Sequence, residues 1–436
     1  MHACSLFMFR DLTLGGERID CMPENVHSFA RCPSGPWSVL RNRDYALFFW
    51  GQLISSAGTE MQVVAVAWQV YIVTHSAVAL GVIGLMRAIP RLLFSLVGGV
   101  LADVLDRRKM LMAINLTMMG FSAVLAFCTN LHVINVVIIY SVILLSATVS
   151  AFDFPTRQAI IPSLVTRDQM ASALSLSATI TQLAFIAGPT LGGFAIGWLG
   201  LAATYWFDVI SYLAVIGSLC LMVVPRVPVE KRARPGFGAL FDGMRFLRTS
   251  QIILSVLILD FCANFFGEAS AMLPVYAQNI MHIGPQGLGL LLAAPALGAV
   301  ALAPFTGVFA RIKRRGVGVM LAPVVWGLCI AAFGFLPNPP WLGVLFLAGS
   351  GAADMASIVL RGLIIQAATP DAYRGRVGAV SAIFVLGGPM LGQFESGLIG
   401  GLFSPTISVV GGGLACVLVS LLIAAVVPDL IRVSAP

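Results

Sequence analysis

Residues 317–336 read VGVMLAPVVWGLCIAAFGFL, an uninterrupted apolar stretch without one charged side chain. A helix needs roughly 20 apolar residues to cross the hydrocarbon core of a bilayer. Arg314 and Arg315 come before the stretch, whereas Pro337, Asn338 and Pro339 follow it. One flank is therefore basic and the other uncharged. Because cytoplasmic loops collect Lys and Arg, the stretch predicts a transmembrane helix whose basic end is cytoplasmic.

The composition of the whole chain places it in the same class. Of the 436 residues, 58% are hydrophobic and 10% are charged, whereas a soluble domain is about a quarter charged. The apolar runs are long and nearly continuous. A transmembrane β-barrel would instead show segments of about 10 residues with alternating polarity. The chain is therefore predicted to be an all-α integral membrane protein.

Twelve stretches qualify as membrane spans. We expect them at residues 45–73, 78–101, 110–129, 132–152, 171–198, 201–225, 251–281, 285–310, 317–336, 341–367, 377–402 and 406–428.

The Lys and Arg residues divide the loops into two alternating sets. The loops around His75, Leu131, Leu199, His282, Pro339 and Ser404 contain neither residue type. Apart from Arg87, Arg91 and Arg361 inside spans, all Lys and Arg fall in the other loops or near the termini. This bias predicts a multi-pass protein of a bacterial plasma (inner) membrane with both termini cytoplasmic.

The spans also suggest domain boundaries. We expect an N-terminal cytoplasmic extension, disordered or preceding a start at Met22, then a six-helix bundle, a basic amphipathic linker on the inner leaflet, a second six-helix bundle and a short cytoplasmic tail. The boundaries are 1–40, 41–225, 226–250, 251–428 and 429–436.

The two predicted bundles resemble each other at an offset of 208 residues. Gln158-Ala159 aligns with Gln366-Ala367, and Gly99-Val100 aligns with Gly307-Val308. The same offset places Glu60 on Glu268, each inside the first span of its half. Halves related by an axis along the membrane normal would bring these acids to opposite walls of one central cavity.

The segment Gly99-Val-Leu-Ala-Asp-Val-Leu-Asp-Arg-Arg-Lys109 resembles the signature loop of the major facilitator superfamily, Gly-x-Leu-Ala-Asp-x-x-Gly-Arg-Arg-Lys. Val104 replaces a usual basic residue and Asp106 a usual glycine. Three further segments are similar to the superfamily's enterobactin and macrolide exporter branch. They are Gly58-Thr-Glu-Met-Gln62, Asp153-Phe-Pro-Thr-Arg-Gln158 and Gly188-Pro-Thr-Leu-Gly-Gly193.

The resemblance implies two six-helix halves that rock to alternate access, commonly with proton antiport. It assigns the gating loop to Gly99, Asp103, Arg107 and Arg108, and a flexing point to Gly188 and Pro189. The Val104 departure puts the gating ion pair partly in doubt, whereas Asp106 suits the exporter branch.

Charged side chains inside a membrane normally face a cavity or a partner. A partly dry cavity favours the protonated form of a carboxyl group, and a nearby cation favours the charged form. We therefore expect Glu60 and Glu268, with Arg87 as the nearby cation, to exchange a proton for a cationic or polar substrate. The alternative is that they form fixed ion pairs between helices.

Other intramembrane charges have less certain roles. Asp153 and Arg361 are repeat equivalents of opposite sign, which suggests either a latch between halves or pairing within each half. Glu395 either pairs with Arg361 or faces the cavity, and both residues are counted among the candidate cavity residues. Arg91 is expected to snorkel to the membrane surface. Asp208 and Asp260 are expected in the interface, and Asp354 has no predicted role.

No nucleotide-binding loop, hydrolytic triad, zinc-protease motif or CxxC pair occurs in the chain. We expect no enzyme activity, metal, cofactor, nucleotide or nucleic acid, and a monomer driven by the proton gradient. The favoured function is export of an amphipathic small molecule that is siderophore-like or drug-like. An importer or facilitator of a metabolite and a lysophospholipid flippase remain alternatives, and the sequence does not encode the substrate.

Overall fold

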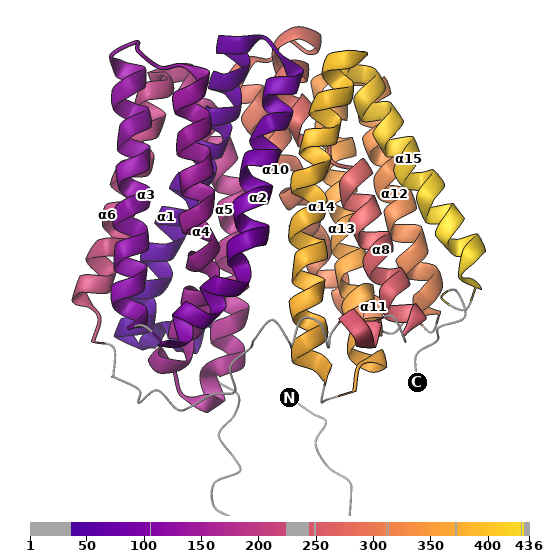
Figure 1. Cartoon of the computed structure of the whole chain (residues 1–436), viewed down its shortest axis with the longest axis horizontal. Coiled ribbons are helices and arrows are strands. Elements are labelled where there is room, and N and C mark those ends of the chain that lie inside the picture. The colour runs from indigo at the N-terminus through magenta and orange to yellow at the C-terminus, as the bar shows by residue number, and fades with distance from the viewer. Residues whose placement is uncertain are drawn as a thin grey trace, which may run out of the picture.

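A computed structural model of the chain describes residues 36–104, 106–223, 244–247, 250–310, 312, 314–370, 373–428 and 430. For Pro36, residues 95–104, Ala310 and Ala379 it describes the backbone alone. The described residues are overwhelmingly helical (Figure 1). Hydrocarbon offers no water to satisfy backbone N–H and C=O groups, so helices are the expected structure for such apolar segments.

The first half of the chain folds into six long helices. They are α1 (Arg43–Thr74), α2 (Ala77–Val104), α3 (Arg107–Asn130), α4 (Val136–Leu164), α5 (Met170–Leu199) and α6 (Leu201–Leu221). Two short 3₁₀ turns, η2 (Pro36–Arg41) and η3 (Arg167–Gln169), precede α1 and α5.

The second half repeats this arrangement with two interrupted spans. The seventh span consists of α8 (Gln251–Phe266), η4 (Ser270–Met272), α9 (Leu273–Val275) and the π-helical turn η5 (Tyr276–Ile280). The eighth span consists of α10 (Gly284–Leu302), η6 (Ala303–Phe305) and α11 (Thr306–Ala310). The remaining spans are α12 (Arg315–Phe335), α13 (Pro340–Ala368), α14 (Arg374–Leu402) and α15 (Pro405–Val426).

Each half is a bundle, and the two bundles meet along two seams. In the first half α1 packs against α5 and α6, while α2 packs against α4. In the second half α12 packs against α13 and α15, and α8 against α14. Helix α2 touches α14, and α5 touches α10, across the boundary between halves (Figure 1). The twelve-helix, two-bundle fold predicted from the sequence is confirmed.

Eleven of these spans are long and apolar enough to cross a membrane by composition alone. The twelfth, α1, contains Gln52, Thr59, Glu60 and Gln62, which lower its hydropathy. Polar residues inside a transmembrane helix are typical of transport pathways. The less apolar helix is therefore the one in which a polar site is most expected.

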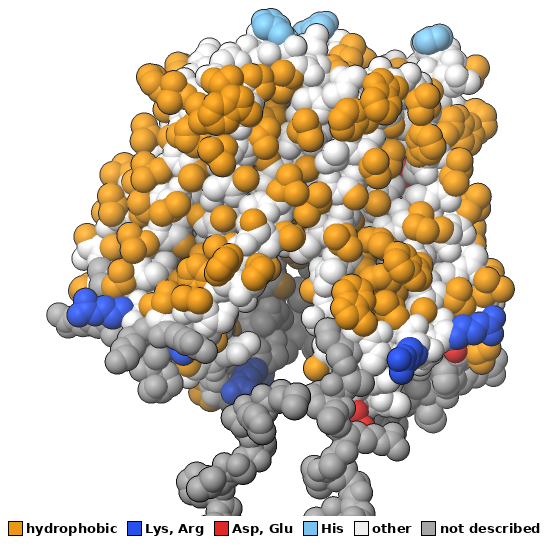
Figure 2. Space-filling view, turned by 180° about the vertical axis from the view of Figure 1, so that it is seen from behind, with side chains coloured by type: hydrophobic (Ala, Val, Ile, Leu, Met, Phe, Trp, Pro, Cys, Tyr) orange, Lys and Arg blue, Asp and Glu red, His pale blue; other side chains and the backbone are white. Residues whose placement is uncertain are grey.

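The two ends of the molecule differ in the side chains that they display. Figure 2 shows histidines at one end, hereafter the histidine end, and Lys and Arg at the other, the charged end. The histidines described are His75, His132 and His282, in short loops where each adopts a positive φ. In the same view the halves meet at the histidine end and part at the charged end. A cleft between the halves therefore opens at the charged end.

One predicted span was misplaced. The fourth span was expected at 132–152, whereas α4 runs from Val136 to Leu164. The Asn135 side chain caps its start by accepting the Ile138 N–H. Its end was missed because Asp153 and Arg157 interrupt the apolar run, although the two charges pair on one face of the helix and let it continue.

Most of the predicted extension, linker and tail lies outside the described residues. Of 1–40 only 36–40 are described, in η2, where Val39 is buried. Of 226–250 only 244–247 and 250 are described, and Leu247 is buried beside Leu257 and Val377. Of 429–436 only Leu430 is described.

Candidate functional site

Tyr71 of α1 and Asn279 of η5 join the two halves near the histidine end. The Asn279 Nδ2 donates a hydrogen bond to the Tyr71 hydroxyl at 2.6 Å. These residues are 208 positions apart, which is the offset of the internal repeat. Two equivalent points that touch must both lie close to the axis relating the copies. This contact therefore marks where the pseudo-twofold axis passes.

The position of Glu60 follows from this contact. Glu60 and Tyr71 lie on one uninterrupted helix, and their separation of 11 positions makes about three turns. Both side chains therefore leave α1 on nearly the same face. Since Tyr71 points toward the axis, Glu60 also faces the other half, roughly 16 Å closer to the charged end.

Gly188 of α5 brings a second helix close to Glu60. A Cβ atom at residue 188 would overlap the Cβ of Glu60 and approach the Ala57 carbonyl oxygen. Only glycine permits α1 and α5 to pack this closely at the acidic residue. The Gly188 and Pro189 positions were predicted as a flexing point, and that role stays a prediction.

Two arginines of α2 flank Glu60. Arg87 and Arg91, one helical turn apart, are the cations that act on the charge of Glu60. Arg91 also donates from Nε to Ser150 Oγ of α4 at 3.3 Å. It was expected to snorkel to the membrane surface, but it is held toward the bundle interior. Among the described side chains Glu60 forms no direct ion pair with either arginine.

Glu268 occupies the break in the seventh span. Helix α8 ends at Phe266, and the next turn begins at Ser270. The Ser270 N–H donates to Glu268 Oε1 at 3.0 Å, so the carboxylate satisfies a backbone group that the break leaves free. Gly392 of α14 lies against it, since a Cβ there would stand 2.9 Å from the Glu268 Cβ. Irregular backbone at membrane depth is tolerated where it is buried in protein or lines a cavity.

Asp354 of α13 is an acidic neighbour of Glu268 that the sequence analysis left without a role. The charge of Glu268 acts on that of Asp354, and no hydrogen bond or ion pair joins Asp354 to another described side chain. Asp354 and Glu268 are distant in sequence, and the repeat carries no acid at position 146. No local pattern could therefore have linked them.

The two halves thus carry opposite local charge. Glu60 lies within electrostatic range of Arg87 and Arg91 in the first half, whereas Glu268 and Asp354 lie within electrostatic range of each other in the second. An anionic group is favoured beside the first set and a proton or cation beside the second.

Arg361, a predicted cavity residue, forms a buried ion pair with Asp260 of α8. Asn264 adds a hydrogen bond from Nδ2 to Asp260 Oδ1 at 3.0 Å. Asp260 is only 4% exposed, so its predicted place in the solvated interface is wrong. A carboxylate can be buried near the end of an apolar run when an arginine from another helix neutralises it.

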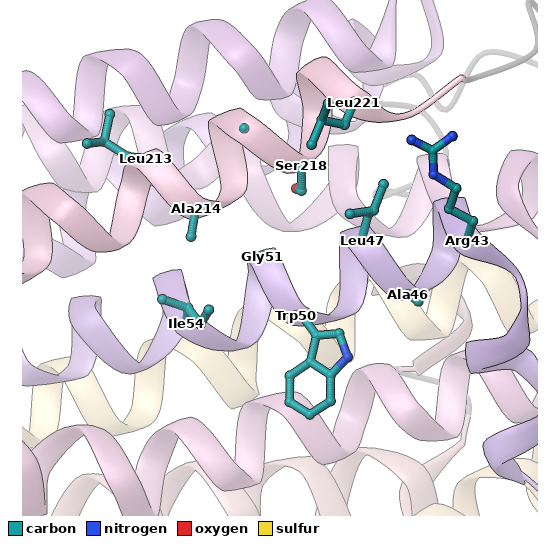
Figure 3. Close-up of a pocket in the computed structure, with 11 residues that line it drawn as sticks. Arg43, Ala46, Leu47, Trp50, Gly51, Ile54, Leu213, Ala214, Ser218 and Leu221 are labelled. Atoms are coloured by element: carbon teal, nitrogen blue, oxygen red, sulfur yellow. The ribbon is translucent and has the colours of Figure 1, made fainter.

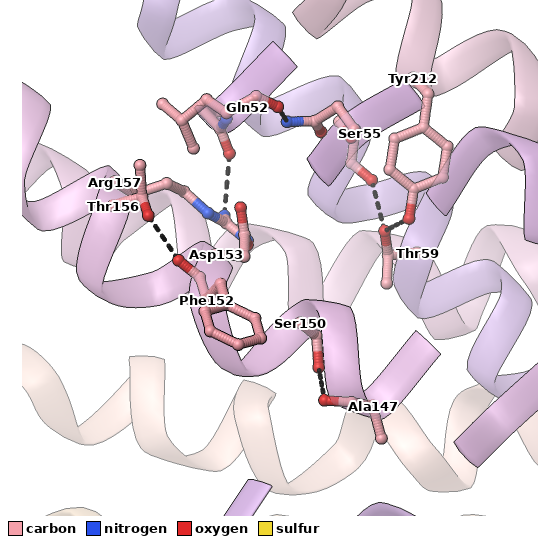
Figure 4. Close-up of polar contacts among 12 residues, drawn as sticks. Gln52, Ser55, Thr59, Ala147, Ser150, Phe152, Asp153, Thr156, Arg157 and Tyr212 are labelled. Carbon is pink, nitrogen blue, oxygen red and sulfur yellow. Dashed lines mark hydrogen bonds and ion pairs between the residues drawn. The ribbon is translucent and has the colours of Figure 1, made fainter. Parts of the chain in front are cut away.

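Asp153 is likewise paired within its own half. It forms an ion pair with Arg157 one turn further along α4, and Arg157 donates from Nη1 to Gln52 Oε1 of α1 at 2.8 Å (Figure 4). Nearby, the Thr59 and Tyr212 hydroxyls lie 3.1 Å apart and join α1 to α6. In this conformation Asp153 and Arg361 therefore form separate pairs within each half, not a latch between the halves.

Glu395 of α14 is partly buried, with no hydrogen bond or ion pair to a described residue. Pairing with Arg361, one of its two expected roles, is not seen because Asp260 occupies that arginine. Its alternative role at the cavity stays a prediction.

Asp208 of α6 is fully buried in the first half, which contradicts its expected place in the membrane interface. Ser122 Oγ donates to Asp208 Oδ2 at 2.6 Å, and Gln62 Nε2 donates to Ser122 Oγ at 2.9 Å. These contacts join α1, α3 and α6 around a carboxyl group held by hydroxyl donors. The sequence shows the residues but not their convergence.

Small residues close the two seams between the halves. A Cβ at Gly81 would come within 2.9 Å of the Gly397 Cα, and one at Gly289 within 3.0 Å of the Gly193 Cα. A Cβ at Gly289 would also overlap the Pro189 carbonyl oxygen. Gly81 and Gly289 are equivalent positions of the repeat, and so are Gly397 and Pro189. The contact of Gly81 with Gly397 is therefore repeated in the contact of Gly289 with Pro189.

The signature loop is described in part. At Gly99 and Asp103, near the end of α2, the structure describes the backbone alone. Arg107 Nη1 donates to the Ala159 carbonyl at 2.8 Å, and Arg108 Nη2 to that of Cys220 at 3.0 Å. Asp106, where the family pattern has glycine, caps α3 by accepting the Arg108 and Lys109 N–H groups.

Comparison with protein families supports the resemblance found in the sequence. Residues 34–434 match the model of the family described as transmembrane secretion effector. The enterobactin exporter EntS of Citrobacter koseri is 28% identical over 393 residues, which cover 89% of this chain and 92% of that protein.

Solved structures share the fold. A POT family transporter in complex with 5-aminolevulinic acid superposes with a TM-score of 0.71 at 11% identity, covering 89% of this chain and 97% of the other. The nucleoside transporter NupG superposes with a TM-score of 0.66 at 13% identity, covering 89% and 99%. At this identity the likeness concerns the fold alone.

Proposed function

The chain belongs to the transmembrane secretion effector family of the major facilitator superfamily, and from this we propose that it is a proton-coupled exporter of an amphipathic small molecule. Glu60 lies on the same face of α1 as Tyr71, and this placement is the main support for the proposal. An acid on that face can meet a substrate in the cleft between the halves. Curated relatives named as exporters make efflux the preferred direction.

We propose that the charged end is cytoplasmic in a bacterial inner membrane. Arg107, Arg108 and Lys109 lie at that end, beside the start of α3, and cytoplasmic loops are enriched in such residues. The cleft in this conformation then faces the cytoplasm, from which an exporter must load. Both termini would also be cytoplasmic.

Alternating access would require the contacts at the histidine end to separate. Tyr71 with Asn279, Gly81 with Gly397, and Gly289 with Gly193 are among the contacts that hold the halves together there. A hydrogen bond and close glycine packing contribute little net stability each, which suits a closure that must open in every cycle. No enzymatic step is needed.

The charge distribution suggests how substrate and proton are separated. Arg87 and Arg91 would attract an anionic part of the substrate, while Glu60 and Glu268, with Asp354 near Glu268, would carry the proton. A molecule with acidic hydroxyl groups matches this charge distribution. A siderophore of the kind named for the relatives has this chemistry, and we propose this class as substrate.

Counterflow into proteoliposomes of the purified protein, with and without a pH gradient, tests this function. The panel should contain a catecholate siderophore, a cationic drug, a sugar and a lysophospholipid. We expect siderophore movement that a pH gradient accelerates. Sugar uptake down its own gradient would instead favour a facilitator, and lysolipid movement a flippase.

A further inference from the structure

An apolar groove runs between α1 and α6 on the outer surface of the first half, at the charged end (Figure 3). Its lining is largely surface-exposed: Trp50 is 54% and Leu221 58% exposed. It faces away from the cleft between the halves, so the transport site does not account for it. The lining side chains include Leu47, Trp50, Ile54, Leu213, Ala214 and Leu221.

Two glycines create the groove. At Gly51 the helices touch, because a Cβ there would lie 2.9 Å from the Ser218 Cβ. Gly217, on the same stretch of α6, has no atom within 4 Å of where its Cβ would be. The floor is therefore tightly packed, while the space above Gly217 is open.

The length of the groove matches one leaflet. It extends from Arg43 to Ile54 along α1, a rise of roughly 16 Å at 1.5 Å per residue. The hydrocarbon core is about 30 Å thick. A single acyl chain of one leaflet would therefore fill it from the surface to near the membrane centre.

Cations stand at the open end of the groove. Arg43 is exposed and forms no hydrogen bond or ion pair with any residue that the structure describes. Arg108 lies at the same end, where its Nη2 donates a hydrogen bond to the carbonyl of Cys220, the residue before Leu221. Two acids that the structure describes also lie at this end: Asp44, which accepts the Val223 N–H at 3.3 Å, and Asp106, which caps α3.

We propose that this groove binds an anionic phospholipid of the leaflet on the charged side, with one acyl chain along α1 and α6 and the phosphate on Arg43. A guanidinium group pairs strongly with phosphate oxygens. Basic pockets between transmembrane helices on the cytoplasmic side are typical sites for anionic headgroups.

Fluorescence quenching of Trp50 tests the proposal in the full chain. The protein is reconstituted in phosphatidylcholine vesicles containing brominated phosphatidylglycerol or brominated phosphatidylcholine at equal mole fraction. Subtracting the signal of Trp50→Phe isolates the contribution of Trp50.

The variants are Arg43→Gln, which removes the free cation, and Gly217→Leu, which fills the groove. The matched controls are Arg167→Gln and Gly120→Leu, exposed positions away from the groove.

We expect brominated phosphatidylglycerol to quench Trp50 with roughly fivefold preference over phosphatidylcholine. Arg43→Gln should abolish the preference, Gly217→Leu should reduce quenching by both lipids, and the controls should match the wild type. Equal quenching by both lipids, or a preference that survives Arg43→Gln, would overturn the proposal. So would a wild-type Trp50 shielded from both, which would mean that another segment of the chain covers the groove.

Discussion

Tyr71 and Asn279 are equivalent residues of the two repeats and are hydrogen-bonded to each other at 2.6 Å. A contact between repeat equivalents locates the pseudo-twofold axis, and this one also lies where the halves are closed. The hydrogen bond must break if the halves separate at the histidine end. It therefore offers a direct way to shift the balance between the two conformations.

Replacing Tyr71 with phenylalanine should favour separation at the histidine end. A typical hydrogen bond contributes about 0.5–1.5 kcal/mol net, so the open population should rise roughly two- to twelvefold. Cysteines introduced at His132 and His282 would carry spin labels in a variant whose native cysteines have been replaced. The distance between the labels would measure the open population. Tyr140→Phe is the control, because the Tyr140 hydroxyl donates to the Ala79 carbonyl within one half. An equal effect of both variants would contradict a closing role for Tyr71.

Gly397→Ala should force the same end apart by steric overlap. The added methyl group would overlap the Gly81 Cα across the seam between α14 and α2. We expect a longer label distance, or a lower melting temperature if the seam cannot yield. Gly120→Ala adds the same methyl group where no atom lies within 4 Å and should change neither. Unchanged distances and stability in Gly397→Ala would show that the seam is looser than described.

The Arg361–Asp260 pair should stabilise the second half. Breaking a buried pair by removing one partner typically costs about 3–5 kcal/mol, so Asp260→Ala and Arg361→Ala should each unfold at lower denaturant concentration. The double variant should lose much less than the sum of the two. Additive losses, or transport abolished at wild-type stability, would instead indicate separate roles for the two residues.

Asp106 should stabilise α3 as its N-terminal cap. Asp106→Ala should lower the free energy of unfolding by about 0.5–2 kcal/mol, whereas Asp106→Gly should lower it by only a few tenths. Chemical denaturation in detergent would resolve the difference. Alanine and glycine variants of equal stability would mean that the bonds to Arg108 and Lys109 contribute nothing.

The sequence predicted the helices well, because a long apolar run in a membrane has one stable structure. The internal repeat alone aligns Glu60 with Glu268. The end of α4 was missed, since the Asp153–Arg157 pair makes a continuing helix look like a loop.

Contacts between distant helices could not be read from the sequence. The partner of Arg361 is a residue 101 positions earlier, and both have several alternatives of opposite charge. The charge interaction of Asp354 with Glu268 and the hydrogen bond from Ser122 to Asp208 exist only because folding brings distant helices together. Spacing within one helix carries no information on such pairs.

The central claim is that Glu60 and Glu268 exchange protons in a cleft shared by both halves. Substrate transport by Glu60→Gln and Glu268→Gln in proteoliposomes, with and without an imposed pH gradient, tests it most directly. We predict that each variant retains exchange of substrate across the membrane but loses its acceleration by the gradient. Full acceleration by the pH gradient in both variants would contradict proton exchange by Glu60 and Glu268.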